Sequence, residues 1–260
     1  MRIALGIEYD GSEFHGWQLQ DDGVRTVQGA VERALGKVAN EPVRVFCAGR
    51  TDTGVHGSGQ VIHIDTTAQR DERAWVFGAN ANLPKDVAVL WAKPVPDSFH
   101  ARFSAMRRAY RYVIFTRPVR PTFLAYRVTW SYCDLDVERM QLAAEYLLGE
   151  HDFSSYRAQG CQAKSPIRTI YRLDVSRHDD FIFIDIEANA FLHHMVRNIA
   201  GVLMSIGSGE AGTQWAQQVL EHRDRTQGGV TAPPYGLYLT TVHYPPEFGL
   251  PTLPPASSVW

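Results

Sequence analysis

Two hydrophobic periodicities alternate along this chain, and the same succession of them occurs twice. Residues 2–9 alternate apolar and polar side chains, as a half-buried strand does. Residues 26–38 carry apolar side chains at helical spacing, with Thr26 in position to cap the helix. Further strand-like runs cover 43–48, 60–65 and 87–94, and a helical run covers 70–81. The resulting order, β-α-β-β-α-β, is that of a ferredoxin-like unit.

The second succession starts with the strand-like segment RRAYRYVIFT. The later runs predict a helix over 135–148, a hairpin of 170–177 with 181–189, helices over 191–207 and 213–222, and a last strand over 237–244. We therefore expect an α+β fold of two ferredoxin-like halves, residues 1–105 and 106–245. Their sheets would join into one extended antiparallel sheet with a central cleft where the halves meet. Residues 246–260 would form a proline-rich tail.

Composition restricts the cellular setting and the kinds of site. The apolar fraction of 45% is enough for a full core. No run of eighteen apolar residues occurs, and the first residues lack the apolar segment of a signal peptide, so we expect a soluble, cytoplasmic protein without a membrane span. Cys47, Cys133 and Cys161 have no paired spacing, which argues against a disulfide framework or a zinc site.

Charge is distributed unevenly along the chain. The formal net charge is −2, which by itself does not indicate a nucleic-acid partner. Residues 98–127, however, contain no acidic residue and seven arginines: Arg102, Arg107, Arg108, Arg111, Arg117, Arg120 and Arg127. Genome composition could account for the preference of arginine over lysine, but it does not explain the missing acids. The segment is suited to contact the phosphates of a polyanion.

A glycine-rich segment, AGRTDTGVHGSGQV at residues 48–61, separates two predicted strands. Its four glycines indicate a tight path in which backbone approaches a ligand closely. Asp52 lies within it, two residues after Arg50, and a carboxylate beside an arginine stays ionised. Asp52 is thus a candidate nucleophile or base. An aspartate that only forms a turn would give the same pattern.

Several motifs together resemble one family. The string GRTDTGVHGSGQV, the opening YDGSEFHGWQ, and then RRAYRY, SPIRTI, ANAFLHHMVRNIAG and YGLYL resemble, in order and spacing, the bacterial tRNA pseudouridine synthase A (TruA) family. The resemblance extends over nearly the whole chain. Thr53 stands where that family usually has alanine, and we interpret it as a tolerated small side chain.

The resemblance implies an isomerase that converts uridine to pseudouridine at positions 38, 39 and 40 in the anticodon stem-loop of tRNA. Asp52 would be the catalytic nucleophile, attacking C1′ or C6 or abstracting a sugar proton. Tyr110 would stack on the target base, although its alternation alone, shared with Tyr112, favours a strand residue that faces the core. Arg197 would pair with Asp52, and Arg50 would act on the RNA. The resemblance also implies a homodimer, an RNA-binding role for the central cleft, and no metal or cofactor.

Two other functions remain as alternatives. The first is an RNA-binding module without catalysis, because RRM domains share the ferredoxin-like topology, although no RNP1-like string occurs. The second is a metal hydrolase that uses Asp52, His56 and His63. Against a metal site, His193 and His194 are adjacent in a predicted helix, where their side chains would point about 100° apart. The chain also lacks an HExxH motif.

Overall fold

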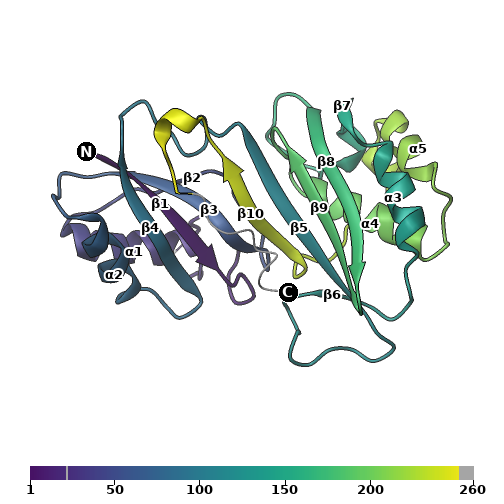
Figure 1. Cartoon of the computed structure of the whole chain (residues 1–260), viewed down its shortest axis with the longest axis horizontal. Helices are drawn as coiled ribbons and strands as arrows, with labels where there is room; N and C mark the ends of the chain where they lie inside the picture. Colours follow the sequence, from purple (N-terminus) through teal and green to yellow (C-terminus); the bar gives the residue numbers. More distant parts are fainter. Residues whose placement is uncertain (22, 252–260) are drawn as a thin grey trace. The chain divides into compact units, whose positions relative to one another are not determined.

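The structure, a computed structural model, describes residues 1–21 and 23–251. Its contacts divide the chain into two compact units. The N-terminal unit comprises Met1–Arg108 together with Tyr238–Trp260, and the second unit comprises Ala109–Leu237. The N-terminal unit thus takes its last strand from the far end of the chain (Figure 1).

The N-terminal unit is a sheet with two helices. Its strands are hydrogen-bonded in the order β4-β1-β3-β10, and β2 also pairs with β3. The bounds are β1 Arg2–Tyr9, α1 Val27–Ala39, β2 Phe46–Cys47, β3 His56–Asp65, α2 Glu72–Asn80, β4 Val87–Val95, β10 Leu237–His243 and the 3-10 turn η3 Pro246–Phe248. The predicted helices are confirmed, and their caps explain where they begin. Thr26 accepts a hydrogen bond from the amide of Gly29, and Asp71 accepts one from the amide of Ala74.

The two faces of this sheet are covered differently. On one face, Ile3, Leu5 and Ile7 pack with residues of α1 and α2 in the main core. The opposite face is lined by small residues of β1, and a Cβ at Gly6 would lie 2.0 Å from Nε1 of Trp91. Glycine is therefore required where the indole crosses β1. That second face is covered by a C-terminal strap, residues 245–250, which packs against it through Phe248 and Leu250.

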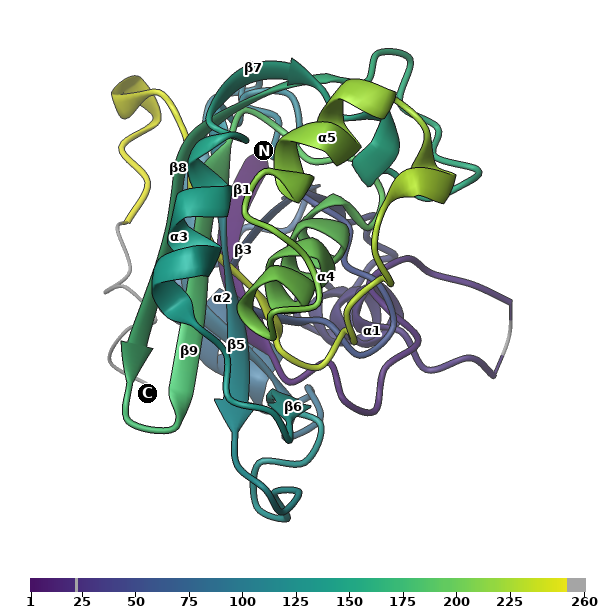
Figure 2. The same cartoon turned by 90° about the vertical axis from the view of Figure 1, so that its right-hand side faces the viewer.

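The second unit is a sheet with a helical layer. Its strands run in the order β5-β9-β8-β7, and β6 pairs with β5. The α3 helix packs on β8 and α4, and α5 contacts both helices, so the helices lie on one side of the strands (Figure 2). The bounds are β5 Arg107–Thr116, β6 Thr129–Ser131, α3 Val137–Glu145, β7 Gly149–Asp152, η1 Ser154–Tyr156, β8 Ile167–His178, β9 Phe181–Ala188, α4 Met195–Gly207, α5 Trp215–His222 and η2 Arg225–Gln227.

The expectation of purely antiparallel strands is wrong. Strand β10 pairs with β3 in parallel, and β6 pairs with β5 in parallel. A parallel neighbour needs a long crossover connection, and the whole second unit lies between β3 and β10. The periodicity of a strand shows which of its faces is buried but does not show the direction of its neighbour.

Two predicted elements are shorter than expected. The strand predicted over 43–48 is reduced to Phe46–Cys47, because the amide of Val45 donates to the side chain of Glu32 rather than to a neighbouring strand. The helix predicted from residue 191 begins at Met195, because His194 has a left-handed φ of 60° that a helix cannot include. A membrane crossing needs a long apolar helix, and none of the helices within 1–21 and 23–251 meets both requirements.

Candidate active site

The loop that carries Asp52 connects β2 to β3 in the N-terminal unit and has a fixed backbone path. The carbonyl of Thr51 accepts a hydrogen bond from the amide of Trp17 at 2.9 Å. The amide of Val55 donates to the carbonyl of Asp52 at 3.1 Å, and Gly54 turns the chain with a φ of 78°. Thr51 is buried while Asp52 is half-buried. The loop backbone is therefore anchored in the protein interior, and the Asp52 side chain lies at the edge of the loop next to solvent.

Two side chains hold this loop from the sheet. The hydroxyl of Tyr9, at the end of β1, shares a buried hydrogen bond of 2.8 Å with Oγ1 of Thr51. Gln60 is fully buried, and its amide group donates to the carbonyl of Gly49 at 2.6 Å and accepts from the amide of Gly49 at 3.4 Å. Gly49 and Thr51, which flank Arg50 and precede Asp52, are therefore tied to two strands.

The opening motif YDGSEFHGWQ packs directly against the Asp52 loop. A Cβ at Gly11 would lie 2.0 Å from the carbonyl oxygen of Val55. Gly16 has a φ of 82°, and a Cβ there would lie 2.8 Å from the carbonyl oxygen of Thr51. Only glycine allows this approach of two backbones. The two motifs, forty residues apart in sequence, thus form one structural unit.

His56 follows the loop and forms a polar contact beneath it. Its Nδ1 atom lies 3.0 Å from the amide nitrogen of Gly11 and 3.2 Å from a carboxylate oxygen of Asp10. The hydrogen bond with His56 holds the pKa of Asp10 well below its usual range, so this carboxylate is ionised at neutral pH. The His56 ring also stacks on Tyr238 of β10, with ring centroids 4.5 Å apart.

Not all glycines of the 48–61 segment have the expected role of letting backbone approach a ligand. Gly54 serves the turn, but Gly57 and Gly59 lie within β3. A Cβ at Gly57 would lie 2.7 Å from the Tyr9 ring, and one at Gly59 would lie 1.9 Å from the carbonyl oxygen of Thr240. Two of the four glycines therefore allow packing of neighbouring protein rather than the approach of a ligand.

Cys47 and Arg50 flank the start of the loop. Burial raises the pKa of the Cys47 thiol to about 12, so the thiol stays protonated at neutral pH and is no nucleophile. The side chain of Arg50 is exposed. Arg50 thus presents a positive charge to solvent two residues before Asp52.

Tyr110 and Tyr112 lie on β5, in the second unit, and both are buried. Tyr112 is 0% exposed, and its hydroxyl donates to the carbonyl of Pro233 at 2.8 Å and contacts Thr129. Tyr110 is 8% exposed, and its ring meets that of Phe191 edge-on at 5.0 Å. Tyr112 is therefore a core residue, whereas Tyr110 keeps a small accessible area.

Arg197 lies in the first turn of α4, also in the second unit. Its Nε donates to the carbonyl of Ala232 at 2.8 Å, while the amide of Ala232 donates to the carbonyl of Arg197 at 3.1 Å. The next residue, Asn198, accepts hydrogen bonds from Arg225 at 3.1 Å and from Thr231 at 2.7 Å. The guanidinium is thus oriented by a loop that follows α5, which sequence reasoning did not identify because these contacts join residues about thirty positions apart.

The histidine pair that precedes α4 is not helical. His193 and His194 lie in the turn before Met195, with ring centroids 4.0 Å apart, so the argument from their angular separation on a helix does not apply. For the metal-hydrolase alternative, Nδ1 of His63 accepts a backbone hydrogen bond from Ala101, and Nδ1 of His56 is occupied by its contacts with Asp10 and Gly11. These contacts argue against using the two side chains as a pair of metal ligands.

Comparisons with known proteins identify relatives over the full length. A family model described as tRNA pseudouridine synthase matches residues 6–104 and 143–245. A protein from Nitrosococcus oceani is 60% identical over 260 residues and covers 100% of both chains. One from Pseudomonas aeruginosa is 61% identical over 96% of this chain and 88% of its own. One from Coxiella burnetii is 58% identical over 97% of both chains. All three are named tRNA pseudouridine synthase A.

Proposed function

Because the chain belongs to the tRNA pseudouridine synthase family, we propose that it isomerises uridine to pseudouridine at positions 38, 39 and 40 in the anticodon stem-loop of tRNA. Asp52 is the catalytic nucleophile in this proposal. The observation that carries it is the Asp52 loop itself: its backbone is held by Tyr9, Gln60 and the amide of Trp17, while the carboxylate lies half-buried at its rim. Such fixed placement is what a nucleophile needs.

The chemistry balances with the chain's own groups. The bond between N1 and C1′ breaks, the uracil rotates, a bond between C5 and C1′ forms, and the hydrogen on C5 leaves as a proton. No electron or external group is transferred, so the balance calls for no metal or organic cofactor. The Asp52 carboxylate attacks C1′ or C6, or removes a sugar proton, and each of these routes requires it to be ionised.

The other site residues act on the substrate around Asp52. A uridine in a stem must leave its stack to be reached, and stacking of Tyr110 on the base recovers about 1–3 kcal/mol of that cost. The small accessible area of Tyr110 and its edge-on contact with Phe191 suit a ring held in one plane. Arg197 pairs with the Asp52 carboxylate, and its fixed Nε supports an oriented guanidinium. The exposed Arg50 acts on the RNA.

The architecture belongs to the same proposal. We propose two ferredoxin-like halves, residues 1–105 and 106–245, that share a sheet and bind RNA in a central cleft, with 246–260 as a tail. The order β4-β1-β3 with β2 on β3, and the order β5-β9-β8 in the second unit, support it. Of the tail, residues 246–250 belong to the strap, and 252–260 lie outside the described residues. The enzyme acts as a homodimer in the cytoplasm, where its substrate is found.

The test is release of tritium from tRNA that carries it at C5 of uridine, measured in EDTA. New bonding at C5 must expel that hydrogen, so release reports the isomerisation. We expect release by the wild type and none by Asp52→Asn, which keeps the shape of the side chain and removes its charge, with tRNA binding retained. Asp179→Asn is the control: Asp179 is 86% exposed at the β8–β9 turn, and this variant should release tritium at the wild-type rate.

Three outcomes would overturn parts of the proposal. Absence of release by the wild type on unmodified tRNA, with binding intact, would leave an RNA-binding protein without this activity. Full release by Asp52→Asn would remove Asp52 from the chemistry. Loss of wild-type release in EDTA, restored by a divalent ion, would favour a metal-dependent reaction.

A further inference from the structure

Four aromatic rings contact one another in the N-terminal unit, outside the Asp52 loop, and three of them reach its surface. Phe46 stacks on His63 with ring centroids 4.9 Å apart and lies 5.6 Å from His100. His100 in turn lies 4.6 Å from His63 and 4.4 Å from Phe103. We call Phe46, His100 and Phe103 the ring platform, with the buried His63 as its support.

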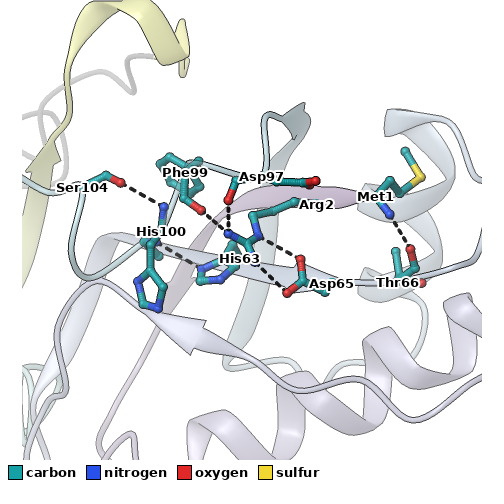
Figure 3. A network of polar contacts seen from close by, with 10 residues as sticks. Met1, Arg2, His63, Asp65, Thr66, Asp97, Phe99, His100 and Ser104 are labelled. Carbon is teal, nitrogen blue, oxygen red and sulfur yellow. Dashed lines mark hydrogen bonds and ion pairs between the residues drawn. The ribbon is translucent and has the colours of Figure 1, made fainter.

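The turn that presents His100 and Phe103 is held by an ion pair behind it (Figure 3). Arg2 makes two 2.8 Å contacts with Asp65 and also donates to the carbonyls of Asp97 at 2.6 Å and Phe99 at 2.7 Å. His100 is fixed further, because its amide donates to Ser104 Oγ at 2.9 Å. The platform is thus a preorganised surface rather than a loose loop.

Within the turn, the two histidines accept backbone hydrogen bonds. Nδ1 of His63 accepts from the amide of Ala101 at 3.1 Å, and Nδ1 of His100 accepts from the amide of Arg102 at 3.1 Å. Burial and the neighbouring positive charges of Arg2 and Arg102 lower the pKa of His100. Its ring is therefore neutral at neutral pH and can stack as an uncharged heterocycle.

The platform leaves large apolar rings in solvent. Phe103 is 75% exposed and Phe46 is 41% exposed. Arg102 places its guanidinium 5.6 Å from the centre of the Phe103 ring. Exposed rings held in a fixed arrangement offer flat surfaces on which another planar group can stack.

Positive charge surrounds the platform. The charges of Arg50, Arg102 and Arg108 act to lower the pKa of the Cys47 thiol, although burial outweighs them, and Cys47 is the neighbour of Phe46 in β2. Arg108 also donates to the carbonyls of Ala48 at 3.1 Å and Arg102 at 2.7 Å, which joins the end of β2 to the 102–108 segment. Fixed rings among cations match a single-stranded nucleic acid, whose bases stack while its phosphates meet arginine.

We propose that the ring platform binds an unpaired base of the same RNA that Asp52 modifies, by stacking on Phe103 and Phe46. This inference rests on the proposed function for the identity of the RNA. Asp52 is six positions after Phe46, and a chain of that length spans at most ~22 Å. One RNA molecule can therefore occupy both places, and the platform would position it without touching the reacting atoms.

The test compares two exposed phenylalanines of the N-terminal unit. Phe103 and Phe77 are 75% and 63% exposed, and each has an arginine near its ring, but Phe77 lies on α2 and is not part of the platform. Affinity for unmodified tRNA is measured in an Asp52→Asn background, so that no turnover occurs. We expect Phe103→Ala and Phe46→Ala each to weaken binding by about 10-fold, Phe103→Trp to retain it, and Phe77→Ala to leave it unchanged.

Thermal melting of each variant separates a binding effect from a loss of fold. Equal affinity of Phe103→Ala, Phe46→Ala and Phe77→Ala, with melting temperatures unchanged, overturns the platform. Dissociation of an oligomer by Phe103→Ala with unchanged RNA affinity also overturns it, since the surface would then bind protein. If the wild-type protein binds tRNA through the platform but releases no tritium, the result contradicts the proposed isomerase activity. The proposal that the platform binds RNA is then still supported.

Discussion

The hydroxyl of Tyr9 is a small group on which the position of Asp52 depends. It meets Thr51 Oγ1 in a buried environment, one residue before the carboxylate. Phenylalanine at this position keeps the ring but leaves the Thr51 hydroxyl without that partner, which typically costs about 1–3 kcal/mol. The loop would then sample positions in which the carboxylate misses its target.

We therefore expect Tyr9→Phe to lower kcat for tritium release by about 10-fold, with KM for tRNA nearly unchanged. The matched control is Tyr156→Phe, which removes a buried hydroxyl that donates to the carbonyl of Ala216 at 2.9 Å in the second unit. This control should lower the free energy of unfolding about as much as Tyr9→Phe does and leave kcat unchanged. If both variants lose activity alike, the effect of Tyr9 is a general loss of stability.

His63 makes the stability of the protein depend on pH. Burial, followed by the electrostatic interaction with the His100 ring, lowers the pKa of His63 to about 4, against about 6.5 in an unfolded chain. Between these values the unfolded state binds more protons. The stabilising contribution is therefore complete above pH 6.5 and is lost as pH falls towards 4.

We expect the free energy of unfolding to fall by about 2 kcal/mol between pH 7.5 and 5 on account of this residue. His63→Asn supplies an amide oxygen that can accept from the Ala101 amide and does not titrate. Urea unfolding at the two pH values should show a smaller decrease for the variant. An identical decrease in both proteins would assign the pH dependence to other groups.

At the scale of elements, hydrophobic periodicity predicts the succession of strands and helices well. Strand β1, helix α1 and the β8–β9 hairpin occur where the spacing of apolar residues indicates, because each buries one face against a core. Element ends are less predictable, because they depend on distant partners. The left-handed φ of His194 delays α4, and the contact of Val45 with Glu32 shortens β2.

The same contrast holds for the candidate site: some of its residues can be recognised from their own segment, and others only from tertiary contacts. Asp52 is recognisable from its own segment, as are the glycines beside it. The groups that hold the loop, Tyr9 and Gln60, look like ordinary strand residues in the sequence, since nothing local indicates which strand end meets which loop. The purpose of Gly59 is visible only once β10 is known to lie beside β3.

For the molecule as a whole, the C-terminal strap links the end of the chain to the N-terminal unit. Phe248 of the strap meets the fully buried Phe99 with ring centroids 5.1 Å apart, and Leu250 packs in the same cluster. Without these two side chains the apolar face over Trp91 would be less well covered. Truncating both side chains to alanine should lower the free energy of unfolding by about 2–4 kcal/mol. The loss is moderate because each side chain is only partly buried.

We expect the double variant Phe248→Ala, Leu250→Ala to unfold at lower urea concentration by that amount and to bind an apolar dye more strongly. Tritium release at low temperature should persist, because the strap makes none of the contacts that hold the Asp52 loop. Leu142→Ala, at a helix position that is 53% exposed, is the control and should unfold like the wild type. Unaltered unfolding of the double variant would show that the strap is not needed to cover this face.

Strand β10 has a consequence for how the protein is made. The β3 segment is synthesised early. The strand that pairs with it in parallel starts at Leu237, after the whole second unit. At typical rates of translation that interval is on the order of 10 s. Throughout it the nascent chain carries Asp52, but His56 lacks Tyr238 and β3 has an open edge. An unfinished polypeptide therefore holds the proposed nucleophile in incomplete surroundings until synthesis is almost over.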